Sequence, residues 1–200
     1  MIGIKNLLPV FLISLLLLSC SSKAQNKLET KFSYTIDSTI KTKIEKMKFA
    51  FGDGAVLDTK LMVNDKESTI PLLGAKGTPC YAMMQQKKDT IMILLMPMWS
   101  PGYGAIDIYL YNDTAVAYNV TAPRDGEKRF KHALTDTVYE SYANAKAIKC
   151  NIILAAKPQW GKPIQGYIEF EGEDFYQRDE GKQSYQAKGY FKVSMIMGNK

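Results

Sequence analysis

The stretch YQAKGYFKVSM, residues 185–195, alternates strictly between two kinds of side chain. Its odd-numbered positions carry Tyr, Ala, Gly, Phe, Val and Met, whereas its even-numbered positions carry Gln, Lys, Tyr, Lys and Ser. Because successive side chains of a β-strand point to opposite faces of a sheet, one face of this segment is apolar and the other is polar. The pattern predicts a half-buried strand close to the C-terminal end of the chain.

The segment PIQGYIEF (163–170) alternates in the same way, and the residues between it and the first segment are rich in turn formers. We therefore expect the two segments to pair as a β-hairpin. A register that places Glu171 opposite Lys188 and Ile168 opposite Phe191 keeps the apolar face apolar and the polar face polar. This is the register that the sequence predicts.

Further alternating runs predict more strands. Three predicted hairpins, with tips at Asp-Gly, at a polar segment and at Asn-Asp, span residues 48–63, 80–96 and 106–120, and another alternating run spans 147–154. The run IMILLM (91–96) is apolar on both faces, so we expect a central strand covered on both sides. The total of about eight to ten short strands predicts an all-β, antiparallel β-sandwich, with a closed lipocalin-like β-barrel as the alternative.

Residues 38–50 fit two structures. Ile36, Ile40 and Ile44 lie at helical spacing, which is typical of an amphipathic helix beginning at Ser38. The β-branched Thr and Ile residues instead favour a long strand with a bulge near Glu45. We prefer the strand.

The N-terminal residues have the pattern of a secretory leader. Lys5 precedes an apolar run over 7–18, which is too short for a membrane-spanning helix of about 20 residues. The run ends at Cys20, for which three interpretations compete. In the first, signal peptidase cleaves after Ala24 and the cysteine has no role. In the second, the cysteine is part of an uncleaved anchor, and in the third it is the site of lipid attachment.

The sequence Leu17-Leu18-Ser19-Cys20 resembles the lipobox of bacterial lipoprotein signals, and lipid attachment is therefore the interpretation we favour. The resemblance implies cleavage before Cys20 and a diacylglyceryl thioether on its sulfur. Two or more acyl chains hold a protein stably on a membrane, whereas one chain holds it marginally. The resemblance also bears on location, because an aspartate directly after the cysteine favours retention in the inner membrane in enterobacterial lipoproteins. This chain has Ser21 at that position. We therefore expect the protein to be anchored in the outer membrane and to face the periplasm.

The predicted organisation follows from this leader. Residues 1–19 form the signal peptide, 20–30 a lipidated tether and 31–200 a single all-β domain, which is long enough to bury a substantial core. The C-terminal segments around 162–176 and 188–193 loosely resemble the closing strands of uncharacterised bacterial β-sandwich lipoproteins. This resemblance transfers no functional residues.

The remaining cysteines, Cys80 and Cys150, are each in phase with apolar neighbours. In an exported, oxidising compartment such a pair is a disulfide candidate. The alternative is two buried thiols, because cysteine is among the most frequently buried residue types.

Composition excludes several kinds of function. The formal charge is +6, but the lysines are dispersed among acids, and no basic-aromatic signature predicts nucleic-acid binding. His132 is the only histidine, so sites that need two histidines are excluded, and no glycine-rich phosphate loop occurs. We expect no cofactor and no metal.

Glu169 and Glu171 share one face of the predicted strand, about 6.5–7 Å apart. This separation lies within the range used by inverting glycosidases, so a hydrolase built on this acidic face is one hypothesis. The competing interpretation is a solvated sheet face on which lysines of the neighbouring strand neutralise the carboxylates. We favour the solvated face.

Aromatic side chains are the preferred candidates for binding. Trp99, Tyr103 and Trp160 lie in loops bounded by Pro and Gly, and Tyr109 and Tyr111 share with Asp107 the predicted polar face of their strand. Flat aromatic groups of this kind stack on sugars or contact proteins. The alternative is that the loop tryptophans fold back as lids over the core.

The sequence therefore predicts a lipid-anchored protein of the bacterial cell envelope that binds or scaffolds without catalysis. Its partner would be a glycan or an envelope protein contacted through the aromatic loops. One alternative function is a lipocalin-like carrier of an apolar ligand inside a barrel. The second is a hydrolase that uses the acidic face.

Overall fold

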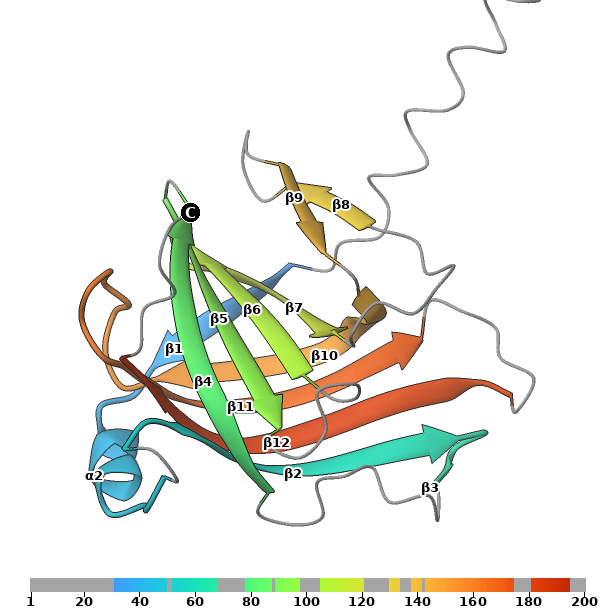
Figure 1. Ribbon diagram of the computed structural model, residues 1–200, viewed down its shortest axis with the longest axis horizontal. Helices are drawn as coiled ribbons and strands as arrows, with labels where there is room; N and C mark the ends of the chain where they lie inside the picture. The colour runs from blue at the N-terminus through green and yellow to red at the C-terminus, as the bar shows by residue number, and fades with distance from the viewer. Residues whose placement is uncertain are drawn as a thin grey trace, which may run out of the picture.

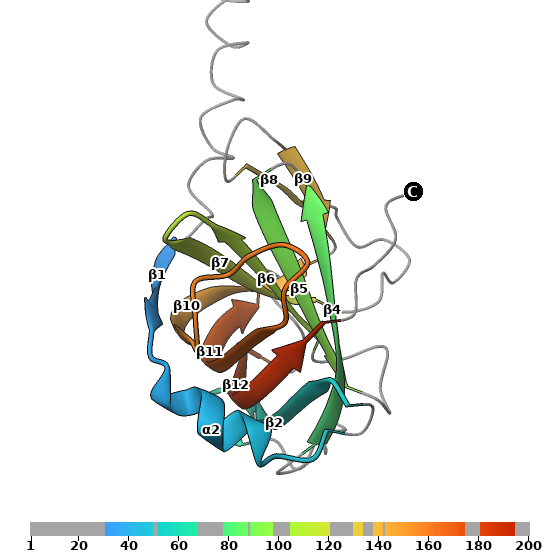
Figure 2. The same ribbon diagram turned by 90° about the vertical axis from the view of Figure 1, so that its left-hand side faces the viewer.

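The computed structural model (Figures 1 and 2) describes residues 31–49, 52–67, 78–87, 89–97, 105–120, 130–133, 138–141, 143–174 and 181–194. The predicted signal peptide and tether lie outside these residues. The elements in chain order are β1 (Phe32–Ile36), α2 (Thr39–Glu45), β2 (Gly54–Val63), β3 (Lys66–Glu67), β4 (Thr78–Lys87), β5 (Thr90–Pro97), β6 (Ala105–Tyr111), β7 (Thr114–Val120), β8 (Phe130–Ala133), β9 (Val138–Ser141), β10 (Ala143–Leu154), β11 (Ile164–Asp174) and β12 (Gln183–Val193).

The strands close into a β-barrel. The sheet runs β12-β11-β10-β1-β7-β6-β5-β4-β2, with β3 attached to β2, and the pairing of β12 with β2 completes a ring of nine strands. The pairings are antiparallel except that β1 runs parallel to β10. The short hairpin of β8 and β9 forms a separate sheet, drawn above the barrel in Figure 1. The all-β prediction is confirmed, and the barrel that we had as the alternative replaces the sandwich.

Apolar side chains fill the inside of the barrel as one cluster. Its largest fully buried members, all less than 2% exposed, are Phe170, Phe191, Leu57, Met84, Ile93, Leu95, Ile106, Ile108, Ile152, Leu154 and Ile168. A barrel of about eight strands has an interior that side chains can just fill. Sandwich and barrel both bury every second residue of each strand, and alternation alone therefore did not distinguish them.

The hairpin of β11 and β12 is confirmed, but its predicted register was wrong by two residues. Glu169, not Glu171, lies opposite Lys188, and Phe191 lies opposite Gly166. A slip of two residues leaves every side chain on the same face, so the polar-apolar pattern could not detect it. Packing selects the true register, because a Cβ atom on Gly166 would lie 2.5 Å from the tip of the Phe191 ring.

The predicted hairpins differ in outcome. Strands β4 and β5 pair as expected, and β6 pairs with β7 around a tight turn in which Asn112 has a φ of 50°. The hairpin over 48–63 was wrong, because Lys48 and Phe49 are not in a strand and β2 begins only at Gly54.

Strand β5 is central, as predicted, since it pairs with β4 on one side and β6 on the other. Its inward residues Ile93 and Leu95 are fully buried. Its outward residues Met92 and Leu94 are only half-buried, so the strand is fully covered on one side and not on both.

The preferred strand over 38–50 was wrong, and residues 39–45 are the helix α2. The Asp37 carboxylate accepts hydrogen bonds from the hydroxyl of Thr39 (2.7 Å) and from its backbone N–H (2.9 Å), and these bonds lower the pKa of Asp37 and form a local turn just before the helix. Ile44 is 1% exposed, and Lys43 lies 4.4 Å from the centre of the Tyr190 ring. Contacts with the outside of β11 and β12 therefore override the β-branched composition.

Candidate functional site

The predicted site residues separate into two groups. Cys20, Trp99 and Tyr103 lie outside the described residues. The described candidates are Tyr109 and Tyr111 on β6, Trp160 between β10 and β11, the cysteines Cys80 and Cys150, and the acidic pair Glu169 and Glu171 on β11.

Two of the three residues on the predicted polar face of β6, Asp107 and Tyr109, are buried. Tyr109 is 2% exposed and Asp107 8%, while Tyr111 is half-buried. The Tyr109 hydroxyl donates to an Asp107 carboxylate oxygen at 3.3 Å. Burial removes the carboxylate from water and raises the pKa of Asp107 to about 7, and the hydrogen bond from Tyr109 opposes part of this rise.

Trp160 lies in the connection between β10 and β11, where it is half-buried and packs against the barrel core. The surrounding turn, in which the Lys162 N–H donates to the Gln159 carbonyl at 3.2 Å, places Gly161 at a φ of +75°. Trp160 therefore occupies the position of a lid over the core, which was the alternative to a binding residue.

We predict that Trp160→Ala lowers the free energy of unfolding by about 2 kcal/mol, because complete burial of such a ring is worth about 3–5 kcal/mol and this one is half-buried. Urea unfolding followed by circular dichroism measures the change. Trp160→Phe, which retains an aromatic ring, should cost about half as much. Unchanged stability of the alanine variant would mean that the ring does not pack on the core.

Cys80 and Cys150 are thiols with no bond between them, which corrects the candidate disulfide. Both belong to the core cluster, and burial raises the pKa of each thiol to about 12. Their phase with apolar neighbours reflects packing inside the barrel, as in the second interpretation.

The carboxylates of β11 face lysines across the strands. Glu169 pairs in register with Lys188, and Lys188 pairs on its other side with Asp58 of β2. Glu171 pairs in register with Lys149 of β10. Opposite charges therefore alternate across β2, β12 and β11 in one row and across β11 and β10 in another, an arrangement that stabilises a solvated sheet face.

These residues surround a shallow depression of about 360 Å³ on the outside of the barrel, lined by Asp58, Lys60, Lys149, Glu169, Phe170, Glu171, Gln186, Ala187 and Lys188. Three carboxylates and three ammonium groups balance in this lining. Glu169 and Glu171 are both partly exposed. A glycosidase needs one carboxyl held neutral by burial, and the geometry here gives no support to the hydrolase hypothesis.

A second, larger depression of about 560 Å³ lies beside α2, and we call it the lysine groove. It is lined by Lys41 and Glu45 of α2, Lys192 of β12, and the connection residues Ala155, Ala156, Lys157, Pro158, Gln159, Lys162, Pro163, Ile164 and Gln165. Four of these side chains are cationic and one is anionic. Unlike the first depression, the lysine groove therefore carries a clear positive excess.

Backbone contacts hold the walls of the lysine groove in place. The Asp37 N–H donates to the Leu154 carbonyl, which joins the start of α2 to the end of β10. The Ala155 N–H donates to the Gln165 carbonyl, which closes the base of the connection. Both distances are 2.9 Å. Two of the segments that line the groove, α2 and the connection after β10, are thus tied to the same corner of the barrel.

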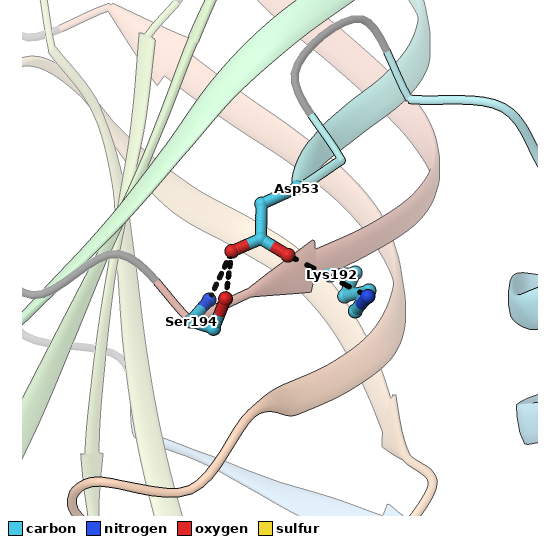
Figure 3. A network of polar contacts seen from close by, with 3 residues as sticks. All are labelled: Asp53, Lys192 and Ser194. Carbon is cyan, nitrogen blue, oxygen red and sulfur yellow. Dashed lines mark hydrogen bonds and ion pairs between the residues drawn. The ribbon is translucent and has the colours of Figure 1, made fainter.

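Lys192 is held by a polar network at the end of β12 (Figure 3). Asp53 accepts hydrogen bonds from the backbone N–H of Ser194, at 2.8 Å, and from its hydroxyl. The other oxygen of Asp53 lies 3.7 Å from the Lys192 ammonium group, and the Asp53 side chain is only 15% exposed. This network fastens the end of β12 to the start of β2 at one end of the closing pair.

The sequence prediction missed the lysine groove. Its four lysines lie at positions 41, 157, 162 and 192, and no two of them are close enough in sequence to form a recognisable basic motif. The only local signal was the proline- and lysine-containing connection around Trp160, which we had selected for its aromatic ring.

Two further findings concern the described residues alone. No group of three or more His, Cys, Asp or Glu side chains is arranged there to hold a metal ion. No helix in that part of the chain is long and apolar enough to cross a membrane.

Comparison of this chain with protein-family models, with curated proteins and with solved structures gives no match.

Proposed function

We propose that this protein is a lipid-anchored binding protein of the bacterial cell envelope, without catalytic activity, that contacts its partner through the outside of its barrel. The packed barrel interior is the observation that carries the proposal. Side chains such as Phe170 and Phe191 have no water-sized space beside them, because they are 0–2% exposed. Of the two depressions formed by described residues on the outer surface, the lysine groove carries the clear positive excess, and it is the one that we propose for binding.

The packed interior also argues against the alternative function, a lipocalin-like carrier of an apolar ligand. A lipocalin-like function needs an unfilled interior lined by apolar side chains. The inward residues of β5, β6, β11 and β12 instead fill that space as one cluster. An apolar ligand could enter only by displacing core side chains, and each large side chain so displaced costs a few kcal/mol.

The position of the groove at one end of β1 supports its use as a binding surface. Phe32, at the end of β1 nearer the predicted tether, pairs with Ala115, whereas Ile36, at the other end, pairs with Leu154 beside α2 and the groove. The two ends of this five-residue strand are about 13 Å apart. The groove therefore lies beside the Ile36 end of β1 and not beside the Phe32 end, which follows the predicted tether, and we propose that an envelope partner binds there.

We predict that bacterial cells expressing the chain and fed a tagged fatty acid incorporate the tag into the mature protein. The thioether requires the sulfur of Cys20, so a Cys20→Ala chain should be untagged and should leave the membrane fraction. Fluorescence of the tag in a denaturing gel, with fractionation of the cells, measures both effects. An untagged wild-type product whose first residue is Gln25 would contradict the anchor and indicate a freely diffusing secreted protein.

A further inference from the structure

We propose that the lysine groove binds an acidic peptide segment of a partner protein. This inference deepens the proposed function by naming the chemistry of the partner. It rests on the proposed function only in requiring that the protein binds a partner, and it does not depend on the lipid.

Charge is the first argument. Glu45 lies 3.8 Å from Lys41, and Asp53 lies 3.7 Å from Lys192, so two of the four lysines have acidic neighbours. Lys157 and Lys162 are exposed and form no ion pair with another described residue. These two ammonium groups, on either side of the turn that carries Trp160, are available to carboxylates of a ligand.

The shape and lining of the groove favour a peptide over a small anion. Its volume of about 560 Å³ lies within the range of about 300–1,000 Å³ that is usual for ligand sites. Pro158 and Pro163 provide apolar surface for side chains, and the amides of Gln159 and Gln165 can pair with a peptide backbone. An extended chain with carboxylates and small apolar side chains matches all three features.

Two other occupants fit less well. A sugar ring is usually bound against an aromatic face, but none of the described groove residues is aromatic, and Trp160 packs on the core. Anionic lipid headgroups also attract lysines. The Gln159 and Gln165 amides and the apolar surface of the prolines, however, suit a peptide better than a headgroup, and a headgroup is distinguished from a peptide in the test below.

The test uses the full chain purified in a nonionic detergent and a fluorescein-labelled peptide in which Glu and Ala alternate. Fluorescence anisotropy should show binding that weakens as NaCl rises from about 0.05 to 0.3 M, because screening reduces the attraction. The same peptide with Gln in place of Glu should bind at least about tenfold more weakly, because it offers the lysines no charge.

Matched variants show where the peptide binds. Lys157→Ala/Lys162→Ala should weaken binding about tenfold, because two charges that form no ion pair with another described residue are lost. Lys60→Ala/Lys149→Ala removes the same charge from the balanced depression on β2 and β10, and it should change binding less than twofold. Circular dichroism of each variant verifies that the barrel remains folded, since all four side chains are exposed.

Three outcomes would overturn the inference. One is no binding of the Glu-Ala peptide, and another is equal loss in both double variants, which would mean attraction to net charge alone. The third is displacement of the peptide by soluble short-chain phosphatidylserine more strongly than by unlabelled peptide, which would identify a lipid headgroup as the ligand. Each leaves the fatty-acid result unchanged, so failure of this inference is distinguishable from failure of the anchor.

Discussion

Replacing Gly189 with alanine is expected to lower the free energy of unfolding by more than about 3 kcal/mol or to prevent folding. Gly189 lies in β12 where this strand pairs with β2, and Leu57 is its partner in the register. A Cβ atom at this position would overlap the Val56 carbonyl oxygen and would lie 2.9 Å from the Cα atom of Leu57. Both atoms belong to the backbone of β2, so only separation of the two strands that close the barrel would relieve the overlap.

Gly161→Ala is the matched control. Gly161 has a φ of +75°, which favours glycine, but no atom lies within 4 Å of the added Cβ. We expect it to cost about 1 kcal/mol, from the backbone conformation alone. Urea unfolding of the two variants, or the fraction recovered folded if Gly189→Ala does not fold, compares them. Equal losses would mean that close contact at the β2–β12 pairing does not limit stability.

Stability is expected to fall as the pH rises from about 4 to about 7, because of Asp107. Burial raises the pKa of Asp107 from 3.8 to about 7 in the folded protein, so the folded state holds a proton in this range that the unfolded state releases. The stabilisation that comes from protonated Asp107 is complete below about pH 4, and it is lost once the pH has passed about 7. A rise of this size corresponds to at most about 4 kcal/mol.

Asp107→Asn isolates this contribution, because the amide has nearly the same shape and carries no charge at any of these pH values. Urea unfolding at several pH values between about 4 and 8 should give a smaller decline for the variant than for the wild type. The variant should therefore be the more stable protein at pH 8. Parallel curves for the two proteins would show that Asp107 titrates in the folded state as it does in water.

Local sequence patterns predicted which segments form strands, but they did not predict how the strands are arranged. Alternation over 163–170 and 185–195 correctly predicted a hairpin with one buried face. Its register depended on the contact between Gly166 and Phe191, which lie 25 positions apart and meet only when β11 and β12 pair. The helix α2 was missed for a related reason, because burial of Ile44 against the barrel outweighed the strand preference of its neighbours.

The candidate site was even less accessible to sequence reasoning. Asp107 and Tyr109 were predicted to lie on a polar face of their strand because they alternate with apolar residues, yet both are buried. Alternation reports which residues share a face of a strand, but not what covers that face. The groove lysines come from α2, the connection between β10 and β11, and β12, and their proximity exists only in the folded chain.

Local sequence was enough to establish an all-β domain, the hairpins β4–β5, β6–β7 and β11–β12, and the apolar phase of Cys80 and Cys150, since each depends on neighbours within one or two strands. Closure of the barrel, the two-residue shift of the last hairpin and the lysine groove required contacts between segments far apart in the chain. The physical reason is that side-chain alternation is a property of one strand, whereas closure and register are settled by backbone pairing and by the fit of side chains across strands.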